Sequence, residues 1–116
     1  MNLSAKAIVA MACYADICRR AGRPNDAAEF RRAAEAFAKQ WAKMADDGDH
    51  FRLAFDKPGT WSQKYNLVWD KVLDLGLFPP EVARKEVRHY LKVQNRFGLP
   101  LDSRAEYTKS DWILWS

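Results

Sequence analysis

Apolar side chains recur at the helical period in four separate segments of this chain, and that recurrence limits the folds open to it. The segments span residues 3–21, 26–45, 66–75 and 80–96. Within each segment an apolar residue returns every three or four positions, which places these side chains on one face of a helix. Glycine or proline lies at the segment boundaries, where it ends or begins a helix. The sequence therefore predicts an all-α fold.

Two shorter features complete the predicted secondary structure. Residues 51–55 alternate between apolar and other side chains, which favours a short extended piece. A fifth helix is expected shortly after Thr108, because Thr108 and Asp111 have the spacing of a capping box. Asp26 and Glu29 have the same spacing where the second helix begins. The fifth helix has room for little more than one turn before the chain stops, which is less than a stable helix needs.

The same period predicts which helical faces point inward. Segment 3–21 is apolar on nearly all sides, which is typical of a buried helix, whereas segment 26–45 has one apolar stripe and one charged side. The residues expected to face inward are Phe30, Ala34, Phe37, Trp41 and Met44 in the second segment and Ala83, Val87, Tyr90 and Leu91 in the fourth.

The connections between the segments alternate between short and long. Residues 22–25 and 76–80 form short, proline-containing turns, whereas 45–65 and 97–109 are long and rich in polar and aromatic side chains. Alternate connections of an up-and-down helical array lie at the same end. We therefore expect both long loops at one end, opposite both short turns. Since sites are usually built from long loops on a rigid scaffold, residues 45–65 and 97–112, together called the loop face, are the predicted site.

Charge and composition exclude several classes of function. The net charge of +4 is spread evenly over both halves of the chain, without the basic stripe that nucleic-acid binding needs. No apolar run approaches the roughly 20 residues that span a bilayer. The two cysteines and two histidines do not form a metal-binding pattern along the sequence. We therefore expect no nucleic-acid partner, no membrane contact, no metal and no cofactor.

Four strings in the second half of the chain resemble the central helical domain of the glutaminase A family. They span 65–70, 77–80, 97–104 and 107–112. The most specific are Pro-Leu-Asp-Ser-Arg, which ends at Arg104, and Tyr-Thr-Lys-Ser-Asp-Trp, which ends the last string. The opening Asn-Leu-Ser-Ala-Lys-Ala-Ile also resembles a family segment that normally follows further sequence. The resemblance covers nearly the whole chain.

This resemblance implies an (α/α) toroid related to the six-hairpin glycosidases. Residues 1–116 would be a fragment of one toroid domain, truncated at both ends, with about two helical hairpins plus the start of a fifth helix. It also implies a longer parent chain, secreted or periplasmic, that hydrolyses L-glutamine to L-glutamate and ammonia. The expected partners are a small-molecule substrate, either an amide or a sugar, and the missing parts of the same parent chain.

Three carboxylates are the candidate catalytic residues, because a pair in unlike environments can divide the acid and base roles. Asp70 lies in an otherwise apolar helix, where it could instead serve as a hydrogen-bonded structural group. Asp102 precedes Arg104 by two positions and could instead form a loop-fixing ion pair. Asp111 could instead cap the last helix together with Thr108.

Polar and aromatic residues of the loop face are the candidate substrate-binding groups. Arg104 could hold a substrate carboxylate with two hydrogen bonds. His50 could carry a proton near neutral pH, or form a loop hydrogen bond beside Asp49. The aromatic residues could form a wall of the site or part of the core. The full set of candidates is His50, Trp61, Tyr65, Asn66, Arg104, Tyr107, Lys109 and Trp112.

Two alternatives to glutamine hydrolysis remain open at this point. Related toroids cleave glycosides with two carboxylates that flank the sugar, and fold alone does not choose between amide and glycoside cleavage. A stacked helical array can also act as a binding or scaffolding segment without catalysis. Asp70, Asp102 and Asp111 converging on one cleft would favour an enzyme, and their engagement in local structural bonds would favour a scaffold.

The residues 1–116 by themselves are expected to be marginally folded or self-associating, and inactive on glutamine. Each large apolar side chain left exposed forfeits about 1.5–3 kcal/mol of burial, while the free energy of unfolding of a domain is only about 5–15 kcal/mol. Size-exclusion chromatography with light scattering, thermal unfolding and an ammonia-release assay test this expectation. A monomer with a sharp unfolding transition and glutamine turnover would contradict it.

Overall fold

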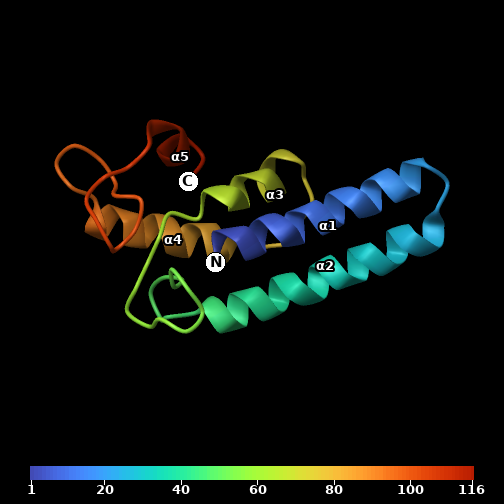
Figure 1. Cartoon of the computed structure of the whole chain (residues 1–116), viewed down its shortest axis with the longest axis horizontal. Helices are drawn as coiled ribbons and strands as arrows, with labels where there is room; N and C mark the ends of the chain where they lie inside the picture. The colour runs from blue at the N-terminus through green and yellow to red at the C-terminus, as the bar shows by residue number, and fades with distance from the viewer.

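The structure is a computed structural model that describes all residues from Met1 to Ser116. Two long helices, α1 (Asn2–Arg20) and α2 (Pro24–Ala45), precede a 3-10 turn, η1 (Tyr65–Leu67), and three shorter helices. The shorter helices are α3 (Val68–Val72), α4 (Pro80–Val93) and α5 (Ser110–Leu114). Bridges between single residues are the only β-type pairing (Figure 1). The predicted all-α fold is therefore confirmed. None of the helices has the length and apolar character needed to cross a membrane.

Helices α1 and α2 form an antiparallel hairpin that contains most of the core (Figure 1). Gly22, in the turn between them, has a φ of 72°, a backbone conformation that glycine adopts without strain. Small side chains line the contact, so the two helices approach closely. The buried alanines of the two helices are Ala5, Ala12, Ala15, Ala34, Ala38 and Ala45.

Trp41, near the end of α2, joins this hairpin to the rest of the chain. Its ring lies 5.3 Å from that of Phe51 in the following loop and 5.4 Å from that of Phe78, just before α4. Its indole N–H donates a hydrogen bond to the carbonyl oxygen of Met1 at 3.2 Å. The fully buried Trp41 side chain thus joins α2 to the N-terminus, to the loop that contains Phe51 and to the connection that contains Phe78.

The third predicted helix is shorter than its apolar pattern indicated. It consists of η1 and α3, and the chain turns immediately afterwards, where Asp74 and Gly76 have positive φ angles of 51° and 63°. Asp70 stabilises this turn, because its two carboxylate oxygens accept the backbone N–H groups of Leu77 and Phe78 at 2.9 and 3.1 Å. Helix α4 also ends before residue 96.

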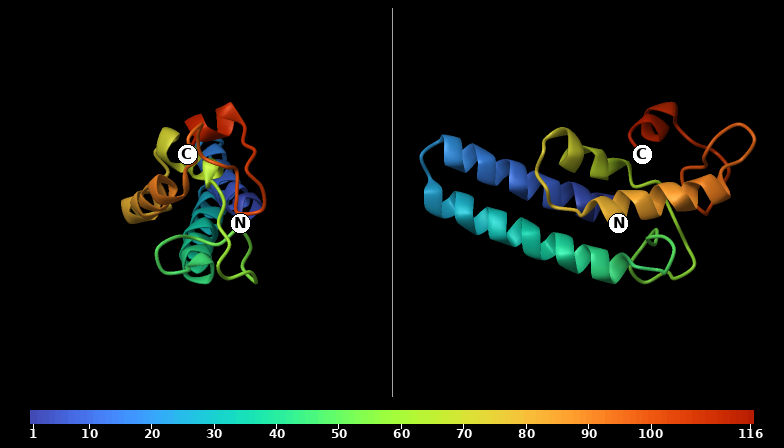
Figure 2. Two further views of the ribbon diagram at one scale, coloured as in Figure 1. Left: turned by 90° about the vertical axis from the view of Figure 1, so that its left-hand side faces the viewer. Right: turned by 180° about the vertical axis from the view of Figure 1, so that it is seen from behind.

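Both long loops lie at the same end of the molecule, as predicted (Figure 1). The backbone N–H of Gln63 donates to Leu101 at 2.8 Å, and that of Ser103 donates to Trp61 at 3.0 Å. The 22–25 turn lies at the opposite end, but the connection before α4 lies alongside the hairpin (Figure 2). The expectation that both short turns share one end was therefore wrong, because α3 and α4 are much shorter than α1 and α2.

The inward faces of the first two helices differ from the predicted ones. In α2 the buried residues are Ala34, Ala38, Trp41 and Ala45, while Phe37 and Met44 are about half exposed. Ala34 and Trp41 are thus buried as predicted, but Ala38 and Ala45 take the places expected for Phe37 and Met44, because small alanines fit the close contact with α1. Helix α1 is not buried on all sides, since Leu3 and Ile17 are exposed.

Helix α4 reverses the expectation more strongly. Its buried residues are Val82, Glu86, His89 and Tyr90, of which only Tyr90 was predicted to face inward. Ala83, Val87 and Leu91, which were expected to face inward, are exposed, and Leu91 has 65% of its surface accessible. Because the loop that packs against α4 contributes polar groups, the polar face of the helix turns toward it.

Neither predicted capping box forms. Helix α2 begins at Pro24 without a side-chain cap, and Asp26 instead pairs with Arg23. Helix α5 begins at Ser110, also without a side-chain cap. The hydroxyl oxygen of Thr108 accepts a hydrogen bond from Gln63 at 3.1 Å instead.

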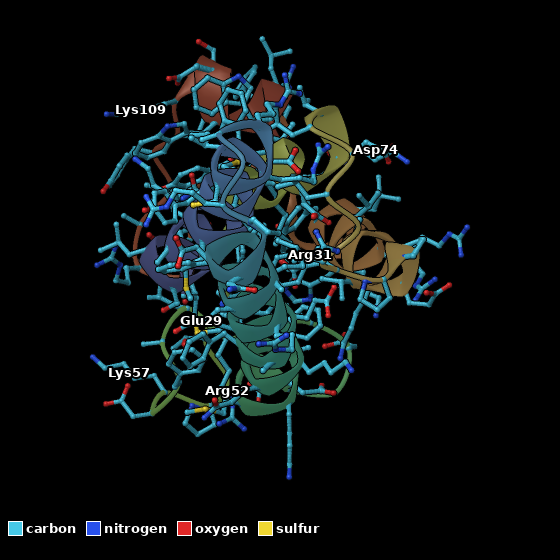
Figure 3. The ribbon with its side chains drawn as sticks, turned by 90° about the vertical axis from the view of Figure 1, so that its right-hand side faces the viewer. Glu29, Arg31, Arg52, Lys57, Asp74 and Lys109 are labelled. Carbon is cyan, nitrogen blue, oxygen red and sulfur yellow. The ribbon has the colours of Figure 1, made fainter.

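Charged side chains project outward around the helices. Figure 3 shows Lys57, Asp74 and Lys109 at the outer edge of the molecule, well separated from one another. This arrangement agrees with the even distribution of charge along the sequence.

We predict that Trp41→Ala lowers the free energy of unfolding by about 3–5 kcal/mol, because it opens a cavity that several segments share. Phe37→Ala on the same helix is the matched control, since Phe37 is about half exposed. Urea unfolding followed by circular dichroism measures both. Equal losses in the two variants would contradict the central position of Trp41.

Candidate functional site

The loop face is supported by a buried polar network between the 51–64 segment and α4. The Lys64 ammonium donates to the carbonyl oxygens of Phe51 and Ser62 at 2.9 and 2.7 Å and lies 3.4 Å from the Glu86 carboxylate. Glu86 accepts the Phe51 N–H and the Tyr90 hydroxyl, each at 2.7 Å. The Tyr90 hydroxyl oxygen in turn accepts a hydrogen bond from the backbone N–H of Lys64 at 2.7 Å. Each polar group in this network therefore has a partner, as burial requires.

Burial changes the acid–base properties of two members of this network. It lowers the pKa of the Lys64 ammonium, while the nearby Glu86 carboxylate opposes that change. It raises the pKa of Tyr90 well above its ordinary value, and Glu86 adds to that effect. Tyr90 therefore stays protonated and acts as a hydrogen-bond donor to Glu86.

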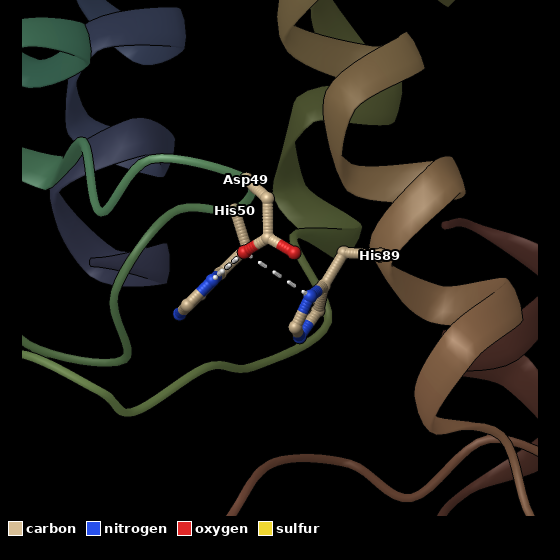
Figure 4. A group of neighbouring side chains, drawn as sticks. All are labelled: Asp49, His50 and His89. Atoms are coloured by element: carbon tan, nitrogen blue, oxygen red, sulfur yellow. Dashed lines mark hydrogen bonds and ion pairs between the residues drawn. The ribbon is translucent and has the colours of Figure 1, made fainter.

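A second cluster joins the loop after α2 to α4 (Figure 4). The rings of His50 and His89 are stacked, with their centroids 4.3 Å apart and their planes 21° apart. Nδ1 of His50 lies 2.8 Å from a carboxylate oxygen of Asp49, and Nδ1 of His89 lies 3.8 Å from the same oxygen. Trp61 packs against His89, with the ring centroids 5.6 Å apart in an edge-on arrangement.

The electrostatics of this cluster favour a neutral His89 beside an ionised Asp49. Burial lowers the pKa of His89, and the neighbouring His50 lowers it further. Hydrogen bonds from His50 and then Lys92 lower the pKa of Asp49 far below its ordinary value. Both ring nitrogens of His89 and Nε2 of His50 are buried without a hydrogen-bond partner. These nitrogens are unusual, because a buried polar atom without a partner costs about 1–3 kcal/mol.

Asp102 and Arg104 form a bidentate pair at the rim of a small pocket. Nε and Nη2 of Arg104 donate to the two oxygens of Asp102 at 2.9 and 2.7 Å, and the Arg104 backbone N–H donates to one of them at 2.9 Å. These bonds lower the pKa of Asp102. Asp102 is buried, but the Arg104 side chain has 66% of its surface accessible. The pocket has a volume of about 360 Å³ and is also lined by Trp61, Asn95 and Glu106.

The three candidate catalytic carboxylates occupy different surroundings. Asp70 holds the turn before α4 and lines a groove of about 1120 Å³ that runs between α2, α3, α4 and the end of the chain. Asp102 lines the small pocket, where Arg104 engages both of its oxygens. Asp111 is exposed on α5 and its carboxylate makes no hydrogen bond or ion pair within the chain. Within residues 1–116 the three carboxylates therefore do not share one cleft.

The predicted aromatic wall divides into two parts. Tyr65 and Trp112 stack on each other, 4.5 Å apart with planes at 9°, and the Lys109 ammonium lies 4.5 Å above the Trp112 ring. Trp61 packs separately, against His89 and Tyr90.

Two further candidate binding residues have contrasting positions. Asn66 is buried, and its side-chain N–H donates to the carbonyl oxygen of Asn2 at 3.2 Å. Tyr107 is exposed, and its backbone carbonyl accepts the N–H of Leu101 at 2.9 Å. Asn66 is thus engaged in structure, whereas the Tyr107 side chain is open to solvent.

Sequence reasoning missed Glu86 and His89, which α4 places beneath the loop face. Neither residue is among those predicted to face inward, because the apolar residues around them dominate the helical pattern. A signal was nevertheless present: Glu86, His89 and Tyr90 have the i, i+3, i+4 spacing of one helical face. Because Tyr90 was predicted to face inward, that spacing places Glu86 and His89 on the inward face as well.

We predict that Glu86→Gln lowers the free energy of unfolding by about 3–5 kcal/mol, because it leaves the buried Lys64 ammonium without its counter-charge. Glu81→Gln on the same helix is the matched control, since its ion pair with Arg84 is solvent-exposed. Thermal and urea unfolding compare the variants. A loss of stability for Glu81→Gln as large as that for Glu86→Gln would contradict the central role of the buried pair.

Comparison with known proteins gives one consistent result. The full chain, residues 1–116, matches the family described as the glutaminase A six helical-hairpin domain. The chain is 33% identical to glutaminase A of Aspergillus oryzae and 28% identical to a probable glutaminase of Arthroderma benhamiae, and each comparison covers 99% of the chain. It spans 17% of the length of each of these relatives. No solved structure matches it. The chain belongs to the glutaminase A six helical-hairpin domain family.

Proposed function

We propose that this chain is part of a glutaminase-like hydrolase that converts L-glutamine to L-glutamate and ammonia, and that the loop face lines its substrate site. Both relatives bear the name glutaminase, which supports this reaction. The observation that carries the proposal is Arg104, an exposed guanidinium fixed in direction by a buried carboxylate at the rim of a pocket. Because the chain spans a small share of its relatives, the other helices of a longer toroid would complete the site.

Arg104 is suited to bind the α-carboxylate of an amino-acid substrate. Asp102 engages Nε and one hydrogen of Nη2, so Nη1 and the second Nη2 hydrogen remain free to donate. A guanidinium held in this way binds a carboxylate without losing further side-chain freedom. Glu106 lines the same pocket and could attract the α-ammonium group. The pocket is shallow and open to solvent, so within residues 1–116 it would form one wall of the substrate site.

Amide hydrolysis also needs groups that move protons between water and the departing ammonia. Asp111 is the strongest of the three candidates, because its carboxylate is free of any bond within the chain. In the proposed arrangement Asp102 positions Arg104, and Asp70 holds the connection before α4. Asp111 does not line the Arg104 pocket, so it would meet the substrate only in a site that the other helices complete, with Lys109, Tyr107 and the stacked Tyr65 and Trp112 beside it.

The engagement of Asp70 and Asp102 in structural bonds favours a second candidate, a scaffolding segment whose catalytic groups lie elsewhere in a longer chain. Glycoside cleavage requires two carboxylates facing one sugar, and residues 1–116 do not bring two free carboxylates together. A substrate panel separates these functions. With a chain of the relatives' length, release of ammonia from glutamine would identify the glutaminase and release of sugar from aryl glycosides would identify the glycosidase. Full activity of a folded Asp111→Asn variant of that chain would favour the scaffold.

We predict that Arg104→Ala raises KM for L-glutamine about 10–100-fold with a smaller change in kcat, because it removes charged hydrogen bonds to a non-reacting group. Arg104→Lys should recover only part of the affinity, since an ammonium cannot form the bidentate contact. The assay measures ammonia release by a chain of the relatives' length that includes residues 1–116.

Arg84→Ala is the matched control, because Arg84 is exposed on α4 and pairs only with Glu81. It should leave KM unchanged. Unfolding curves of all variants separate a loss of binding from a loss of structure. An unchanged KM in a folded Arg104→Ala variant would refute the proposed role of the pocket.

A further inference from the structure

The proposed hydrolysis assigns no role to the two stacked histidines, although most of their ring nitrogens are buried without a partner. His50 and His89 have 9% and 8% of their surface exposed, and three of their four ring nitrogens have no hydrogen-bond partner. The fourth, Nδ1 of His50, lies against Asp49. Buried polar atoms nearly always have a partner, and Nδ1 of His89, which faces the Asp49 carboxylate at 3.8 Å without a hydrogen bond, is the one of these nitrogens that an ion beside Asp49 would satisfy.

We propose that Asp49, His50 and His89 form a three-ligand site for a divalent transition-metal ion of the zinc type. The three ligand atoms lie within 4.8 Å of one another. Figure 4 shows the Asp49 carboxylate beside both Nδ1 atoms. In a tetrahedral zinc site, bonds of about 2.0–2.1 Å separate neighbouring ligand atoms by about 3.3 Å. The observed separations from the Asp49 oxygen, 2.8 and 3.8 Å, lie on either side of that value. Because an imidazole binds an ion in the plane of its ring and the two planes are only 21° apart, one ring must turn about its Cβ–Cγ bond when the ion binds.

The surroundings of the cluster fit such a site. Asp47 lies 3.6 Å from Nε2 of His50, on the side of the ring away from Asp49, and is itself held by Arg52 at 2.9 Å and by the Gly59 N–H at 2.6 Å. A carboxylate that accepts a hydrogen bond from the second ring nitrogen orients a metal-bound imidazole, and Asp47 would need to move slightly closer to Nε2 to do so. Asp49 has 56% of its side chain exposed, so an ion can reach the cluster from solvent.

The donor set selects the class of metal. Imidazole nitrogens favour zinc and its first-row neighbours, whereas magnesium and calcium prefer sites made only of oxygen. Three protein ligands leave one position of a tetrahedral ion for water or substrate. The Lys92 ammonium, 3.0 Å from the second Asp49 oxygen, is the one cation already at the cluster and would be displaced outward.

Zinc titration of a chain of the relatives' length that includes residues 1–116 tests the site independently of any glutaminase activity. Isothermal calorimetry should show one equivalent of Zn²⁺ bound to the unaltered chain, with no displacement by excess Mg²⁺. His89→Gln and Asp49→Asn should each weaken zinc binding at least about tenfold. Asp49→Asn guards against misfolding, because Asp49 is exposed. Asp16→Asn, an exposed carboxylate on α1 outside the cluster, should bind zinc as the unaltered chain does.

Thermal unfolding of the same variants with and without zinc gives a second test of the site. Zinc should raise the unfolding temperature of the unaltered chain and of Asp16→Asn, but not of His89→Gln. Failure of the unaltered chain to bind one equivalent would overturn the proposal, as would equal affinity in folded His89→Gln. Binding of Co²⁺ with a thiolate charge-transfer band would also overturn it, because that band would place the ion on Cys13 or Cys18.

Discussion

The buried contact between Lys64 and Glu86 is the interaction on which the shape of this chain depends. A buried charge is tolerated only when it is paired and its remaining hydrogen-bonding capacity is satisfied. Here the Lys64 ammonium also donates to Phe51 and Ser62, and the Glu86 carboxylate also accepts from Phe51 and Tyr90. Removing either charge would leave several segments without their common partner.

This network determines how α4 is attached to the rest of the molecule. The α1–α2 hairpin is held by close contacts between small apolar side chains, but α4 turns a polar face toward the loop after α2. The loop is anchored to α4 through Glu86 and Tyr90, and the second long loop is anchored to the first through backbone hydrogen bonds at Gln63 and Ser103. Arg104 and the two histidines therefore lie on segments that buried hydrogen bonds hold in place.

The exposed apolar residues of α1 and α4 fit a segment of a larger helical array. Leu3 and Ile17 on α1 and Val87 and Leu91 on α4 are exposed, although their helical period is that of a buried face. In stacked helix pairs such faces are covered by neighbouring pairs. The family match over the whole chain and the greater length of the relatives support this interpretation.

The sequence by itself determined the helical class, the approximate position of each helix and the meeting of the long loops. These properties depend on local periodicity, on glycine and proline, and on the alternation of loop lengths, all of which are written in neighbouring residues. It also indicated Asp102 with Arg104, since the two are close along the chain. Only the tertiary structure decided which faces are buried, because burial depends on the partner. Alanines, and not Phe37 and Met44, lie at the α1 contact. Glu86 and His89 face inward, where they contact Lys64 and His50. Those pairs are far apart in the sequence, so no local pattern could join them.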